Sequence, residues 1–95
     1  MGIDGSGNVG IGTTSPATKL EVDGSGDTQF RINSSGTDAG ISLISSTSGG
    51  RHYIIYSGGA GSGIGTGNLG FYDATAGLTR MVINGSSGNV GIGTT

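Results

Sequence analysis

The sequence predicts an all-β fold made of short antiparallel strands, and three observations support this prediction. A phrase consisting of an apolar residue, then Asp or Asn, then a cluster of Gly and Ser occurs four times, beginning at Ile3, Val22, Ile32 and Ile83. Short stretches between these phrases alternate apolar and polar residues, which is typical of strands with one buried face. No window carries apolar residues at the 3.6-residue period of a helix, and residues 14–19 have room for one short turn at most.

The repeated phrases predict tight hairpin turns. Asp-Gly and Asn-Gly between apolar stretches are the strongest short hairpin signal, because both central residues of a type I′ turn need a positive φ. We therefore expect such turns at Asp4-Gly5, Asp23-Gly24 and Asn84-Gly85, and more loosely at Asn33-Ser34.

Six stretches between the turns predict the main strands. Residues 53–56 and 69–72 place apolar side chains on both faces, which suits strands that are covered on both sides. Along residues 80–83 we expect Arg80 and Val82 to point outward. The predicted strands are residues 20–22, 30–32, 41–44, 53–56, 69–72 and 81–83.

Residues 57–70 form a separate segment that holds seven glycines. Clusters of Gly and Ser between strands are usually loops. The segment is therefore expected to be a long flexible loop, with a tightly packed segment of closely approaching backbone as the alternative.

The chain has few large apolar side chains for its length. Leu, Ile, Val and Phe total 20 of the 95 residues, whereas Gly, Ser and Thr total 47. Gly loses more backbone freedom on folding than any other residue, so this core is too small for a free-standing domain. The chain is either disordered or completed by other chains. The net charge of -2 and the 25 Ile, Val and Thr residues favour assembly.

The two ends of the chain repeat one phrase, GNVGIGTT, at residues 7–14 and 88–95. In Val9-Gly10-Ile11-Gly12 one strand face is apolar and the other is bare, which lets another backbone approach closely. Three such strands around a threefold axis would make a thin, interwoven stem.

Composition and motifs exclude several classes of function. No apolar run is long enough to span a membrane, no signal peptide is visible, and four basic against six acidic residues disfavour nucleic-acid binding. The sequence has no Cys, and its GxGxxG match at residues 65–70 lacks the following helix of a dinucleotide site. His52 is the only histidine, and no nucleophile elbow accompanies it. We expect no enzyme activity, no cofactor and no metal.

Side chains suited to contact gather in two stretches. Four of the five aromatic residues lie within residues 51–56 and 71–73, beside Arg, His and Asp. Tyr combines an apolar face with a polar tip, and sugar-binding sites pair such platforms with hydrogen-bonding side chains. These aromatics form either the core of a small β domain or an outward contact surface. The candidate ligand-binding residues are Arg51, His52, Tyr53, Tyr56, Tyr72 and Asp73.

The segment GNVGIGTTSPATKLEV at residues 7–22 resembles a recurrent segment of bacteriophage tail fibres and of fibre-like trimeric adhesins of bacteria. Residues 70–93 resemble the shaft-proximal module of the same family. The resemblance covers residues 1–22 and 69–95, whereas residues 24–68 match only in style. It implies a homotrimer of intertwined β structure that presents recognition surfaces to a cell surface, often to glycans.

Together these observations predict a homotrimeric intertwined β fibre module, with a small antiparallel β domain at residues 23–84 between stem motifs at residues 1–22 and 85–95. The expected role is structural and adhesive attachment to a cell-surface glycan or receptor, outside the cell, on a virion tail fibre or a bacterial surface fibre, as a segment of a longer protein. A ligand-free spacer of a fibre shaft is the alternative, and a tailspike-type glycan hydrolase is a weaker one, because it needs paired carboxylates.

Overall fold

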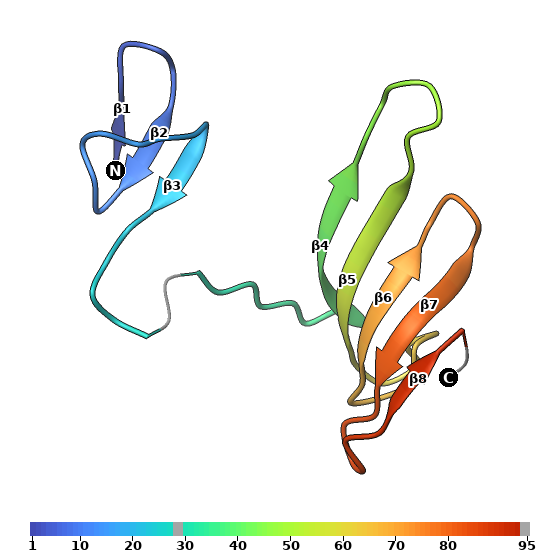
Figure 1. Ribbon diagram of the computed structural model, residues 1–95. Coiled ribbons are helices and arrows are strands. Elements are labelled where there is room, and N and C mark those ends of the chain that lie inside the picture. Colours follow the sequence, from blue (N-terminus) through green and yellow to red (C-terminus); the bar gives the residue numbers. More distant parts are fainter. Residues whose placement is uncertain (28–29, 94–95) are drawn as a thin grey trace. The chain divides into compact units, whose positions relative to one another are not determined.

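A computed structural model describes residues 1–27 and 30–93 of the chain. These residues form strands joined by turns and loops (Figure 1). No helix occurs in these residues, which confirms the predicted all-β class. The chain divides into two compact units, Met1–Arg31 and Ile32–Thr95. The expected boundaries at residues 22 and 84 stay predictions, and residues 28–29 and 94–95 of those segments lie outside the described residues.

The first unit is a small three-stranded sheet. Its strands are β1 (Gly2–Ile3), β2 (Val9–Ile11) and β3 (Leu20–Val22). β1 pairs with β2 in antiparallel fashion, and β3 lies parallel to β2 on the opposite edge. The amide of Val9 donates to the carbonyl of Lys19 and the amide of Asp23 donates to that of Ile11, each at 2.8 Å. The strand predicted at residues 20–22 is thereby confirmed.

The second unit is a five-stranded antiparallel meander, in which each strand pairs with the next along the chain (Figure 1). The strands are β4 (Asp38–Ile44), β5 (His52–Gly58), β6 (Leu69–Asp73), β7 (Leu78–Ile83) and β8 (Val90–Ile92). Four of the predicted strands lie within β4, β5, β6 and β7. The strand predicted at residues 30–32 is wrong, because Phe30, Arg31 and Ile32 have no strand pairing and are exposed.

The expected type I′ turns are also wrong, since none of the described Asp and Asn residues has a positive φ. The hairpins β1–β2 and β7–β8 use a longer turn in which the Oδ1 atom of Asp4 or Asn84 accepts two backbone amides at 2.9 Å. The positive φ falls instead on Gly7 (79°) and Gly88 (75°). Side-chain capping by Asp or Asn therefore replaces the left-handed conformation that the Asp-Gly and Asn-Gly pairs predicted.

The glycine-rich segment after β5 is a packed loop. The amides of Gly58 and Gly67 donate to the carbonyls of Asn68 and Gly58, each at 2.8 Å, and close the loop at its base. Ile64, 3% exposed, folds back onto β6 at Gly70, where a Cβ would lie 2.8–3.0 Å from three Ile64 side-chain atoms. The segment is a loop, as predicted, and its backbone packs closely at Gly58, Gly67 and Gly70, in agreement with the alternative of closely approaching backbone.

A bulge between β6 and β7 explains why Val82 is not outward. Phe71 pairs with Met81 and Tyr72 pairs with Thr79, so Arg80 has no partner on β6. Beyond the bulge Val82 lies opposite Gly70, on the face that Ile64 covers, and is 2% exposed. Arg80 keeps half of its side chain in solvent.

Candidate functional site

The pairing register divides the side chains of the five-stranded sheet between two faces. Residues in register across neighbouring strands share a face, and alternate residues along a strand point to opposite faces. One face, here called the apolar face, carries a nearly unbroken set of hydrophobic side chains. It consists of Ile41, Leu43, Tyr53, Ile55, Leu69, Phe71, Leu78, Met81, Ile83, Val90 and Ile92.

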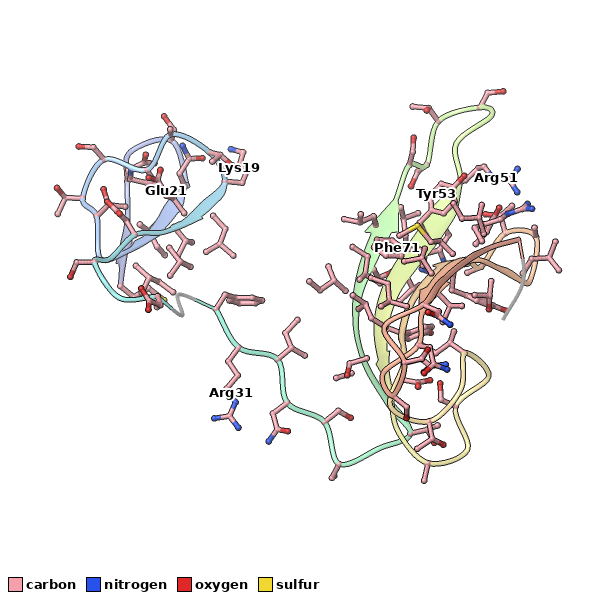
Figure 2. All side chains as sticks on the ribbon, turned by 60° about the horizontal axis from the view of Figure 1, so that its bottom comes forward. Lys19, Glu21, Arg31, Arg51, Tyr53 and Phe71 are labelled. Carbon is pink, nitrogen blue, oxygen red and sulfur yellow. The ribbon has the colours of Figure 1, made fainter. Side chains whose placement is uncertain are left out.

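The apolar face is largely uncovered in the isolated chain. Ile92 is 77% exposed, Val90 56% and Leu43 55%, while Phe71 and Met81 near its centre are half-buried. Figure 2 shows Tyr53 and Phe71 on neighbouring strands of this sheet. Contiguous apolar patches of this kind on soluble proteins mark interaction surfaces.

A cluster of charges adjoins Tyr53 on this side of the sheet. Asp73, 1% exposed, accepts hydrogen bonds from Nη2 of Arg51 at 2.6 Å and Nη2 of Arg80 at 3.0 Å through Oδ2, and from the Ala76 amide through Oδ1. Burial by itself would raise the pKa of the Asp73 carboxyl, but the hydrogen bonds from Arg51, Ala76 and Arg80 outweigh it and lower that pKa to about 2. The carboxylate therefore serves to hold two half-exposed arginines in place.

The opposite face, here called the cleft face, contains a cavity of about 520 Å³. Its walls are the aromatic rings of Tyr56 and Tyr72, whose centroids lie 6.1 Å apart at an interplanar angle of 51°. The Tyr56 ring lies against the backbone of Gly40 on β4, where a Cβ would come within 2.7 Å of Cδ1. A glycine in this strand thus sets the ring's position.

Polar groups line both ends of this cleft. Asp38 and Ser62 contribute at the end near the glycine-rich loop, and Thr79 contributes from β7. The Oδ1 atom of Asp38 is buried and has no hydrogen-bond donor among the described residues. No Arg, Lys or His of that part of the chain lines the cavity. The cleft therefore joins two aromatic faces to one carboxylate whose charge nothing in its described lining balances.

The six predicted site residues do not form one site. Arg51, Tyr53 and Asp73 belong to the side of the apolar face, whereas His52, Tyr56 and Tyr72 belong to the cleft face. Only Tyr56 and Tyr72 come together in the cavity. Asp38, Ser62 and Thr79, which also line the cavity, were not among the predicted residues. The alternation of Asp38 with Gly40 along β4 was the available signal, because it places the carboxylate on the same face as Tyr56.

His52 forms a side-chain pair of its own. The Oγ atom of Ser42 lies 2.6 Å from Nε2 of His52, and the His52 amide donates to Thr75. Among the described residues no carboxylate is hydrogen-bonded to this histidine, so the pair lacks the third group that orients the base of a catalytic triad. Within residues 1–27 and 30–93, no group of three His, Cys, Asp or Glu side chains is placed to hold a metal ion.

Comparison with known protein families and with curated proteins finds no match for this chain. Nor does the described part of the chain contain a helix long and apolar enough to cross a membrane.

Proposed function

We propose that this chain is a structural and adhesive segment of a homotrimeric β fibre that acts outside the cell and attaches to a cell-surface glycan or receptor. The exposed apolar face of the five-stranded sheet is the observation that carries this proposal. The resemblance of residues 7–22 to segments of tail fibres and bacterial trimeric adhesins adds the fibre, the trimer and the extracellular location.

The isolated chain leaves most of its large hydrophobic side chains unburied. Among the described residues only two large apolar side chains, Ile64 and Val82, are buried, and both belong to the cleft side of the sheet. Fully burying an exposed Ile or Leu contributes about 1.5–3 kcal/mol, so covering the apolar face by other copies stabilises the assembly substantially. Threefold packing brings the three apolar faces together around one axis and supplies the core that the composition lacks.

Light scattering on the full chain tests this proposal with a matched pair of variants. Ile41 and Ile44 lie on the same strand, both exposed, but Ile41 belongs to the apolar face and Ile44 to the opposite one. We expect the parent and Ile44→Lys to have the mass of three 9.2 kDa chains and Ile41→Lys to dissociate. A parent that is a folded monomer at micromolar concentration contradicts the trimer, and equal behaviour of the two variants contradicts its interface.

Adhesion is distinguished from a ligand-free spacer by glycan-array binding. An adhesive segment gives reproducible hits that are lost when exposed side chains are substituted, and a spacer gives none. A tailspike-type hydrolase requires two carboxylates flanking the scissile bond. In the described residues the cleft contains one, Asp38, and the Asp73 carboxylate is held by arginines outside the cleft.

A further inference from the structure

We propose that the cleft lined by Tyr56 and Tyr72 binds a primary ammonium group carried on a short alkyl stem. The inference concerns one chain and stands apart from the trimer proposed above. Because the cleft lies on the side of the sheet opposite the apolar face, assembly through the apolar face leaves it open.

The carboxylate of Asp38 is the first reason for a cationic ligand. Asp38 is half-buried, and withdrawing a carboxylate oxygen from water is costly unless an opposite charge or hydrogen-bond donors accompany it. Within the described parts of the chain, the Oδ1 atom of Asp38 is buried without a donor and no basic side chain lines the cavity. A ligand ammonium supplies both the charge and the N–H donor, and such charge-assisted bonds are about twice as strong as neutral ones.

The two tyrosine rings are the second reason. Their centroids lie 6.1 Å apart at an interplanar angle of 51°, so the rings contact each other, and both residues line the cavity. A cation within about 6 Å of a ring centroid is attracted by the negative face of the ring, and the attraction grows as water is excluded. The cleft thus places aromatic faces and a carboxylate along the same cavity, and both disfavour an anion there.

The remaining lining fits the stem of such a ligand. Ile54 and Ile64 add apolar surface, while Ser62 and Thr79 add hydroxyl groups that accept N–H donors. A volume of about 520 Å³ accommodates a small ligand, since binding pockets span about 300–1,000 Å³. The ligand chemistry that uses all of these groups is an alkylammonium, such as the end of a lysine side chain.

Amide chemical shifts of the full chain during titration with n-butylammonium chloride test the proposal, with 1-butanol as the neutral analogue. We expect saturable shifts confined to residues around the cleft, about tenfold weaker binding of 1-butanol, and weakening of n-butylammonium binding by 0.5 M NaCl. Equal binding of the two probes, shifts outside the cleft, or no shifts overturns the proposal. Preferential binding of methyl α-D-glucoside also overturns it, by making the cleft a neutral sugar site.

Variants separate the carboxylate from the rings. Asp38→Asn keeps the shape of the side chain and should weaken n-butylammonium binding about tenfold. Asp27→Asn removes the same charge from an exposed position in the other unit and should leave binding unchanged. Should Asp38→Asn not fold, Tyr72→Phe, which keeps the ring, and Tyr72→Leu, which removes it, serve instead. Loss of binding in both Tyr72 variants, or in neither, contradicts the role of the ring.

Light scattering of the same samples reports the number of chains independently. A trimer that does not bind n-butylammonium refutes only the proposal of an ammonium site. A monomer that binds n-butylammonium refutes only the proposal of a trimer. The two proposals therefore fail separately.

Discussion

Replacing Gly70 with Ala tests whether the glycine-rich loop is held by the packing of Ile64 on β6. A Cβ at position 70 would lie 2.8 Å from Cδ1, 2.9 Å from Cγ2 and 3.0 Å from Cβ of Ile64. Because Ile64 is 3% exposed and its own Cβ is one of the three atoms, a rotamer change alone does not relieve the clash, and the loop backbone must shift. Overpacking of this kind costs about 1–3 kcal/mol.

A double-mutant cycle isolates this contact. Ile64→Ala alone removes a buried side chain down to Cβ and should cost about 2–5 kcal/mol. In the presence of that substitution the new Cβ at position 70 no longer meets Cδ1 or Cγ2, so most of the overpacking is relieved. The double variant should therefore be more stable than the sum of the single effects predicts, by about 1–2 kcal/mol.

Thermal denaturation followed by circular dichroism, at one fixed protein concentration, measures these effects, because assembly makes the midpoint depend on concentration. For a domain of this size about 1 kcal/mol lowers the midpoint by about 4–8 °C. Gly63→Ala, in the same loop, is the control, since a Cβ there meets nothing within 4 Å and the residue has no positive φ. Additive effects of the two substitutions, or a Gly63→Ala variant as unstable as Gly70→Ala, would refute the packing account.

The remaining predictions concern the charge cluster around Asp73, the glycines of the first unit and the side chain of Asn68, which anchors the glycine-rich loop. Because the pKa of Asp73 is lowered from 3.8 to about 2, its contribution to stability is complete above about pH 4 and is lost as the pH falls toward 2. Melting curves at several pH values should show this loss of stability. Asp73→Asn should be less stable than the parent at pH 7, and its stability should not fall in the same way between about pH 4 and pH 2. Gly7→Ala should cost about 1–2 kcal/mol for its positive φ alone. Gly12→Ala should cost more in melting experiments, because a Cβ there also collides with the Asp23 carbonyl oxygen; equal costs would contradict this. Asn68→Ala removes two hydrogen bonds, to the Ile64 carbonyl and from the Gly85 amide, at about 1 kcal/mol each, and should speed hydrogen exchange of that amide; unchanged exchange would argue against the anchor.

Local sequence patterns predicted the strands well where alternation was clear and a partner strand lay nearby. Residues 20–22 follow such a pattern and pair with residues 9–11. Residues 30–32 alternate equally well but have no partner, and pairing is a property of the whole sheet that a short window does not contain. The alternation of apolar and polar residues therefore predicts a strand only when the fold supplies its neighbour.

Features that depend on contacts distant in sequence were missed. Val82 is buried because a bulge at Arg80 changes the register, and nothing in residues 78–83 marks that bulge.

The candidate site divides between two faces because His52 and Tyr53 are adjacent in sequence and thus point to opposite sides of a strand. This division, unlike the bulge, follows from the alternation rule alone, since the rule applied to residues 51–56 assigns neighbouring side chains to opposite faces.

The two hairpins with the same turn chemistry have a consequence for how such a chain is built. Ile3 pairs with Val9 as Ile83 pairs with Val90, and each turn has its own capping oxygen and its own left-handed glycine. One hairpin belongs to a mixed sheet and the other lies at the end of an antiparallel sheet. The repeated sequence motif therefore adopts a similar turn in two different surroundings. A motif that adopts the same hairpin in two different sheets can be copied within a gene without redesign of the surrounding sheet, and duplication alone can then change the length of the protein.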